Sequence, residues 1–119
     1  MKTHKDLEVW KKAIDLVTVI YEQTQSFPKE EIYTLTSQMR RAAISIPSNI
    51  AEGAARKSDK ELVQFLYIAL GSLVELDTQL MIASNLKYID KEQYILLQQR
   101  LDEIGKMLNG LITYRKSKI

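Results

Sequence analysis

Residue types that commonly perform catalysis or bind metals are scarce in this sequence of 119 residues. It contains no cysteine and one histidine, His4, which we expect to be exposed in a frayed terminus. Without thiols there is no disulfide scaffold, thiolate metal site or cysteine nucleophile. One imidazole cannot supply the paired Glu-x-x-His motifs of a di-metal bundle. Glu75 and Asp77 point in different directions on a helix, and glycine-rich phosphate loops and serine nucleophile elbows are missing. The sequence therefore predicts no catalytic residue, no metal site and no cofactor.

Lysine and arginine remain as residues that could act on a partner, through contacts to phosphate oxygens. The 17 basic and 15 acidic residues give a net charge of +2, which does not by itself indicate a nucleic-acid-binding protein. The distribution of charge is more informative than its sum. Residues 61–90 carry one basic and four acidic side chains, whereas residues 91–119 carry six basic and three acidic ones.

The elements that would position these charges are helices. Apolar residues recur at three- and four-residue steps along the whole chain, and no strand-like alternation is present. Four helices are predicted: one that follows Asp6 as its N-cap and stops near 26–28, one from within 29–33 to 53–57, one from 58 to about 85, and one from 90 onward.

Local signals sharpen three of these helices. Pro47 would ordinarily end a helix, but the apolar residues on either side of it keep one phase, so we expect a single kinked second helix. Ser58 and Glu61 form a capping box for the third helix, and Asp90 and Gln93 form another for the fourth. Gly71, Gly105 and Gly110 are interpreted as close helix–helix contacts.

Short links between four long helices favour an all-α, up-down-up-down antiparallel four-helix bundle, formed as a single domain over residues 1–119. The charged start lacks a signal peptide, and no window reaches the length of a membrane span. We therefore expect a cytoplasmic protein that does not interact with membranes.

This topology collects basic residues at one end of the bundle, where the first and third helices start and the second and fourth end. The expected basic residues there are Lys2, Lys5, Arg56, Lys57, Lys60, Arg115, Lys116 and Lys118. The acidic residues of that end are fewer, and several have capping roles. Phosphate binding is one interpretation, and solubilising terminal lysines are the other.

The third helix carries a second apolar stripe, displaced by about a quarter turn from its core stripe. A side of the second helix away from its core face is also small or apolar. The residues assigned to a subunit interface are Ile44, Ala51, Val63, Tyr67, Leu70, Val74 and Met81. Such stripes predict a homo-oligomer, unless the bundle is lopsided and covers them itself.

Three segments also carry a resemblance to a known family. They are Asp6 to Trp10 with Ala13, Tyr21 to Pro28 (YEQTQSFP), and Gln38 to Arg56 (QMRRAAISIPSNIAEGAAR). The last follows a Q-x-R-R-A-x-x-S-I-P-x-N-I-A-E-G pattern, and the similarity spans roughly residues 6–115. On these residues the chain resembles the 23S rRNA intervening-sequence protein family.

The resemblance implies a small four-helix bundle that assembles as a ring-like homopentamer. A related group is similar to the accessory protein of diversity-generating retroelements, a basic pentamer that works with a reverse transcriptase and nucleic acid. Positions here that match such a role are Arg40, Arg41, Arg56 and Lys57. Asn49 and Glu52 belong to the motif, and either bind a partner or hold the kinked helix.

Two hypotheses follow. The first is a non-catalytic oligomer that binds structured RNA through basic residues. The residues assigned to nucleic-acid binding are Arg40, Arg41, Arg56, Lys57, Lys60, Arg115 and Lys116. The alternative is a structural or protein-interaction scaffold that binds no nucleic acid.

Overall fold

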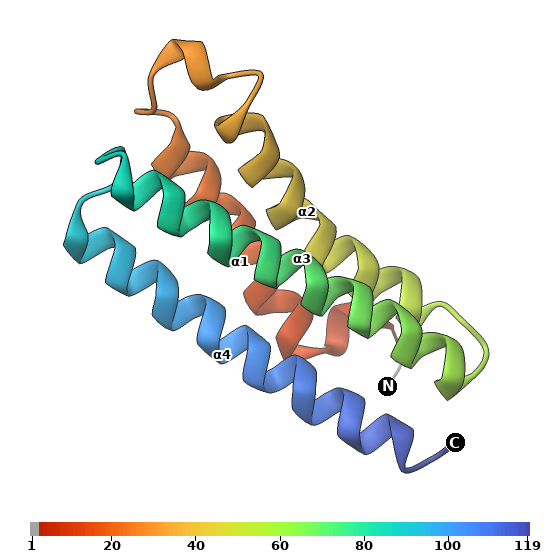
Figure 1. The fold of residues 1–119 in the computed structure, drawn as a ribbon. Coiled ribbons are helices and arrows are strands. Elements are labelled where there is room, and N and C mark those ends of the chain that lie inside the picture. The colour runs from red at the N-terminus through yellow and green to blue at the C-terminus, as the bar shows by residue number, and fades with distance from the viewer. Residues whose placement is uncertain (1–2) are drawn as a thin grey trace.

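The computed structural model describes residues 3–119, and only the backbone of Asp6. In chain order its elements are the 3-10 turn η1 (His4–Asp6), α1 (Glu8–Thr24), the 3-10 turn η2 (Lys29–Glu31), α2 (Leu35–Ala54), α3 (Asp59–Asn85) and α4 (Lys91–Lys116). No strand occurs within residues 3–119, and successive helices run antiparallel in an elongated body of 45 × 24 × 20 Å (Figure 1). The predicted all-α four-helix bundle is confirmed.

The helices do not share their contacts equally. α2 and α3 pack together most extensively, and α1 and α4 least. Along the α1–α4 side runs a groove of about 450 Å³ lined by both helices, Val19 from α1 and Leu96 and Arg100 from α4 among others. Nearby, the Lys12 ammonium of α1 lies 3.3 Å from the Glu103 carboxylate of α4. The bundle is therefore closed along α1–α2–α3–α4 and more open where its first and last helices face each other.

Small residues allow the close contact between α2 and α3. Ala42, Ala43 and Gly53 of α2 are buried, as is Ala69 of α3. A Cβ atom on Gly53 would lie 2.8 Å from the Cβ of Phe65, closer than real Cβ contacts. Gly53 therefore lets the end of α2 lie directly on the start of α3.

The second helix passes through Pro47 without a break, as predicted. Proline supplies no N–H, so the carbonyl of Ala43 lacks the hydrogen bond of a regular helix. Ile46, Pro47 and Ile50 are all buried on the core side. Burial of this apolar segment offsets the lost backbone bond.

The predicted caps are confirmed in part. Ser58 Oγ accepts from the Glu61 N–H at 3.2 Å, and Asp90 Oδ1 accepts from the Gln93 N–H at 2.8 Å. The reciprocal bonds of the two capping boxes, from the Glu61 and Gln93 side chains back to the backbone of the cap residues, are not formed. The Glu61 carboxylate accepts from the Ser58 hydroxyl, and the Gln93 side chain accepts from Gln23 of α1 instead.

Three expectations about local structure are wrong. The N-cap residue of α1 is Leu7 rather than Asp6, because the chain first makes the turn η1. His4 is half-buried, with its ring edge-on to Trp10 at 5.0 Å between centroids. A Cβ atom on Gly71 or Gly110 would meet nothing within 4 Å, so neither marks a close helix contact.

Among the helices described, α3 alone is long and apolar enough to cross a membrane by length and composition. Core helices of soluble bundles pass the same test. One face of α3, from Leu62 to Ala83, is buried against the other helices. Its apolar character follows from this core face together with exposed apolar residues on its outer side.

Candidate nucleic-acid interface

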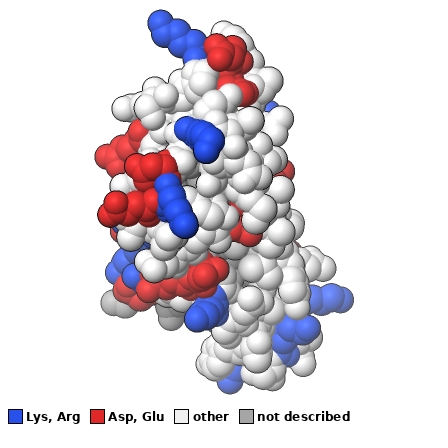
Figure 2. All heavy atoms as spheres, turned by 60° about the vertical axis from the view of Figure 1, so that its left-hand side comes forward, with Lys and Arg blue, Asp and Glu red and all other residues white. Residues whose placement is uncertain are grey.

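Five of the seven basic residues assigned to nucleic-acid binding lie at one end of the bundle. Arg56 and Lys57 follow the end of α2, Lys60 lies in the first turn of α3, and Arg115 and Lys116 end α4. Lys2 lies outside the described residues. In Figure 2 the lowest part of the face drawn carries blue side chains without red ones, whereas blue and red side chains are mixed over its middle and upper parts. We call this region, formed by Arg56, Lys57, Lys60, Arg115 and Lys116, the basic end.

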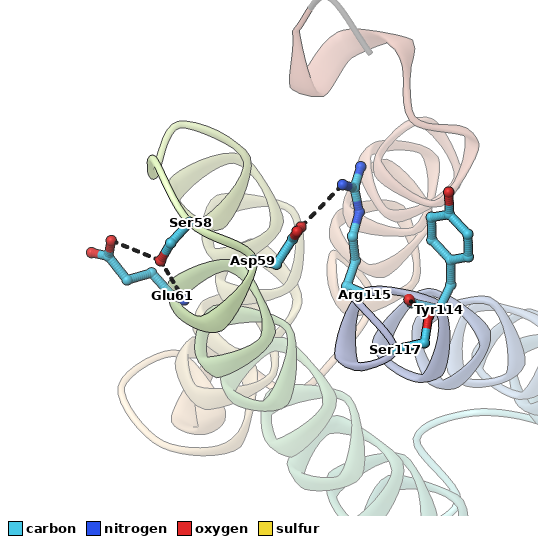
Figure 3. Close-up of polar contacts among 6 residues, drawn as sticks. All are labelled: Ser58, Asp59, Glu61, Tyr114, Arg115 and Ser117. Atoms are coloured by element: carbon cyan, nitrogen blue, oxygen red, sulfur yellow. Dashed lines mark hydrogen bonds and ion pairs between the residues drawn. The ribbon is translucent and has the colours of Figure 1, made fainter. Parts of the chain in front are cut away.

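Within the basic end, Arg56 and Arg115 have acidic partners in the same chain. Arg56 Nη2 lies 3.1 Å from Glu52 Oε2, an i,i+4 pair, and its guanidinium carbon lies 4.8 Å from the centre of the Phe65 ring. Arg115 Nη1 lies 3.1 Å from Asp59 Oδ1, in a pair that is largely shielded from solvent (Figure 3). These two charges are in part neutralised before any partner arrives.

The three lysines of the basic end form no ion pairs among the described residues. Lys116 donates to the Tyr67 hydroxyl at 3.3 Å, a neutral partner that leaves its charge intact. Lys57 and Lys60 are exposed, and among the described side chains neither lies within ion-pair distance of a carboxylate. The free positive charge of the basic end therefore comes mainly from Lys57, Lys60 and Lys116.

Arg40 and Arg41 lie elsewhere. They precede Arg56 by about four turns of α2, roughly 24 Å along its axis. Arg40 Nε donates to Thr24 Oγ1 at 2.9 Å, tying α2 to α1, and Arg41 is exposed beside a shallow groove between α2 and α3. One phosphate contact surface cannot include both arginines and the basic end unless the ligand is long.

The motif residue Asn49 has a structural partner. Its Nδ2 donates to the backbone oxygen of Ser45 at 2.8 Å and to Ser45 Oγ at 2.9 Å. Ser45 Oγ lies 2.8 Å from Ser72 Oγ of α3, and the Ser72 hydroxyl donates to the Ile68 carbonyl. Either serine hydroxyl can be the donor in the contact between them. Asn49 thus orients a hydrogen-bond chain that links α2 to α3.

The residues assigned to a subunit interface lie on two sides of the bundle. Ile44 and Ala51 line a groove of about 280 Å³ on the α1–α2 side, together with Trp10, Ile14 and Pro47. Tyr67, Leu70, Val74 and Met81 lie on the side of α3 that faces α4, as the hydrogen bonds from Gln98 to Asp77 and from Lys116 to Tyr67 indicate. Because α2 and α3 occupy the middle of the helix order, these two apolar surfaces are on opposite faces of the bundle.

The expectation of an exposed stripe is wrong at Val63, which is only 6% exposed and belongs to the core. In the rest of that stripe Val74 is 57% exposed, Met81 51% and Tyr67 47%, whereas Leu70 is partly buried against the core. Val63 packs into the core cluster, so the first residue of this stripe is covered within the chain. Sequence periodicity also missed Trp10 and Ile14 as parts of the α1–α2 surface.

Among the described residues, no group of three or more potential metal ligands comes together. The carboxyl of Glu31 accepts hydrogen bonds from the Thr34 and Tyr88 hydroxyls, and both bonds lower its pKa. The bond between Glu31 and Tyr88 also raises the pKa of Tyr88. This pair lies at the end of the bundle opposite the basic end and ties the turn before α2 to the turn after α3.

Together, the fold and the charged end define a small all-α bundle protein with basic residues gathered at one end and apolar surfaces on two faces. Residues 5–110 match the sequence model of the 23S rRNA-intervening sequence protein family, and the chain belongs to that family. No curated protein matches the chain.

A solved structure supports the same assignment. The chain is similar to the crystal structure of a protein with unknown function from the S23 ribosomal protein family of Bacteroides thetaiotaomicron, with a TM-score of 0.82 and 26% sequence identity. The match covers 88% of this chain and 95% of that one. The family, like this neighbour, comes without an assigned activity.

Proposed function

We propose that this protein is a non-catalytic, cytoplasmic oligomer that binds structured RNA through its basic end. The observation that carries the proposal is the set of cations that three helix termini bring together, in which Lys57 and Lys60 are exposed and form no ion pair among the described residues. Exposed lysines of this kind fit phosphate oxygens and release counterions on binding. Arg40 and Arg41 are left out of this contact surface because they lie near the other end of α2.

The oligomer rests on the two apolar surfaces. Exposed Val74, Met81 and Tyr67 lie on the α3–α4 face, and Ile14 and Ile44 lie on the α1–α2 face. Surfaces on opposite faces cannot both be buried by one twofold contact between identical patches. They can be buried head-to-tail, with the α3–α4 face of one copy on the α1–α2 face of the next, and such contacts form rings when the rotation closes. Five copies, the number that the family resemblance implies, would repeat the basic end five times around one rim.

The head-to-tail arrangement has a sharp test by light scattering. Ile44→Lys disables one face and Val74→Lys the other, and each variant alone should be monomeric. An equimolar mixture should form dimers and nothing larger, because each pair retains one good α1–α2 face and one good α3–α4 face. A monomeric wild-type protein would refute the oligomer. A variant that still dimerises alone would show that the contact joins identical faces.

RNA binding is tested with a fluorescein-labelled RNA stem-loop in anisotropy titrations. We expect the affinity to fall steeply between about 50 and 200 mM salt, and the double variant Lys57→Glu/Lys60→Glu to abolish binding. The matched control is Lys29→Glu/Lys91→Glu, which makes the same change in net charge at the opposite end and should bind like the wild type.

Two outcomes contradict the proposal. Equal loss in both double variants would mean that net charge alone attracts RNA, without a site at the basic end. A flat titration at low salt would support the alternative, a scaffold that recruits a protein partner. The internal pairing of Arg56 and Arg115 and the net charge of +2 are the observations on the side of that alternative.

A further inference from the structure

A pocket of about 400 Å³ lies at the end of the bundle opposite the basic end, beneath the turn that joins α1 to α2 (orange in Figure 1). It is bounded by the end of α1, the turn η2 and the first two turns of α2. The described residues that line it are Thr24, Gln25, Phe27, Pro28, Lys29, Ile32, Thr36 and Arg40. The lining contains two cations and no acidic residue.

Arg40 is held in one orientation at this pocket. Its Nε donates to Thr24 Oγ1 at 2.9 Å, and the Thr24 hydroxyl in turn donates to the Ile20 carbonyl at 2.8 Å. The guanidinium carbon lies 4.5 Å from the centre of the Tyr21 ring, so the guanidinium also rests on an aromatic face. An arginine side chain usually loses much rotamer freedom when it binds a ligand. Because Arg40 is already held in place, ligand binding there costs less conformational entropy.

The outer half of the guanidinium is available. Among the described residues, Arg40 makes no ion pair, and its Nη1 and Nη2 atoms have no hydrogen-bond partner. Neither is a buried unsatisfied atom, so both reach solvent. Two adjacent nitrogens with parallel N–H bonds form the fork that binds a carboxylate through both oxygens.

Thr36 supplies a second polar group. It is 2% exposed, and its Oγ1 has no hydrogen-bond partner in the structure. A buried hydroxyl without a partner is costly unless something in the pocket satisfies it. The nearest carboxylate in sequence, that of Glu31, is engaged by Thr34 and Tyr88, so it does not neutralise Arg40.

We propose that this pocket binds a small organic carboxylate with an apolar body. The carboxylate oxygens accept from the two Nη groups of Arg40, and the ligand's apolar part packs against Phe27, Pro28 and Ile32. Lys29, exposed at the turn, adds positive charge. The pocket is independent of the RNA contact surface proposed above, which lies at the opposite end of the molecule.

The probe is benzoate, titrated into the isotope-labelled full-length protein by NMR at low salt. We expect saturable shifts of amides in residues 24–40 with a Kd of about 1 mM or tighter. Arg40→Lys keeps the charge but loses the two-nitrogen fork, and should weaken benzoate binding about tenfold. Arg41→Lys, the same change at the neighbouring position on another face of α2, is the matched control and should leave the affinity unchanged.

Thr36→Val removes the unpartnered hydroxyl with little change in volume and should also weaken benzoate, which keeps the test open if Arg40→Lys does not fold. Circular dichroism checks the fold of each variant. Unchanged affinity in both folded variants would overturn the proposal. So would inorganic phosphate bound as tightly as benzoate, because a general anion site needs no apolar wall, or benzyl alcohol bound as tightly, because a purely apolar pocket needs no guanidinium.

Discussion

Arg115 in the last turn of α4 forms an ion pair with Asp59, the first residue of α3, with 3.1 Å between Nη1 and Oδ1 (Figure 3). The two side chains are 25% and 31% exposed, less than those of any other ion pair between described side chains. Each charge also complements the dipole of its own helix, a carboxylate at an N-terminus and a guanidinium at a C-terminus. The pair therefore fixes the end of the chain to the rest of the basic end.

A double-mutant cycle on this pair, Asp59→Asn with Arg115→Gln, should give a coupling free energy of about 1 kcal/mol in urea unfolding. The partial burial of both groups is the reason for a value at the upper end of the range for such pairs. The control cycle, Glu8→Gln with Lys11→Gln, probes an exposed i,i+3 pair and should give about 0.3 kcal/mol. Equal couplings in the two cycles would show that burial adds nothing at Asp59.

Alanine substitutions at Gly53 and Gly71 should have opposite effects on stability. Gly53→Ala should destabilise the protein by about 1–3 kcal/mol, because the new Cβ would lie 2.8 Å from Phe65 Cβ and 2.9 Å from Leu62 Cδ1. Gly71→Ala, which meets nothing within 4 Å, should stabilise α3 by about 0.5–1 kcal/mol through backbone entropy. Thermal unfolding measures both, and a stabilised Gly53→Ala variant would mean that α2 and α3 separate there without cost.

Features set by neighbours in sequence were predictable. The Ser58 and Asp90 caps, the pair of Glu52 with Arg56 and the continuous helix through Pro47 all depend on residues within about one turn of each other. Helix periodicity placed the core for the same reason. Family membership, read from the motif around Pro47, agrees with the match over residues 5–110.

Features set by contacts between helices were not predictable from one sequence. The ion pair of Asp59 with Arg115 joins residues 56 positions apart, and no local pattern indicates it. Val63 shares a stripe with Val74, yet only Val63 is covered within the chain. Gly71 was expected at a close helix contact and Gly53 was not, but the packing of α2 on α3 places the close contact at Gly53. Periodicity gives the direction of a side chain on its helix but not what lies opposite it.

The two hydrogen bonds to Glu31 predict how its pKa changes when each is removed. Its pKa is lowered by the Thr34 hydroxyl first and the Tyr88 hydroxyl second, so Thr34→Val should raise that pKa more than Tyr88→Phe does. NMR titration of the Glu31 side-chain carbon measures its pKa in both variants. The control is Thr18→Val, the same type of change at an exposed position on α1. The reverse order would contradict the assignment of the stronger bond to Thr34.

The same pair predicts how stability depends on pH. A carboxyl whose pKa is lower in the folded state stabilises the fold above its unfolded pKa, near 4.5, and loses this contribution as the pH falls through the folded value. Tyr88 has the opposite sign: its raised pKa stabilises the fold below the unfolded value, near 10, and the contribution is lost as the pH rises through the folded one. Tyr88→Phe should therefore lower Tm at neutral pH more than at acidic pH, as the Glu31 carboxyl becomes protonated. An equal decrease at the two pH values would mean that the Tyr88 hydroxyl acts independently of the Glu31 charge.

Lys87 carries the remaining prediction. It follows the end of α3 with a φ of 64°, a left-handed conformation that costs a side-chain-bearing residue about 1–2 kcal/mol. The conformation is enforced by the helix terminus, where the Lys87 N–H donates to the Ser84 carbonyl and the Tyr88 N–H to the Ala83 carbonyl. Lys87→Gly removes the steric conflict and should stabilise the protein by about 1 kcal/mol. Lys106→Gly, an exposed position inside α4, should instead destabilise by about 1 kcal/mol. Urea unfolding of both variants gives the comparison, and a loss of stability in Lys87→Gly would mean that interactions of the lysine side chain outweigh the strain of its backbone.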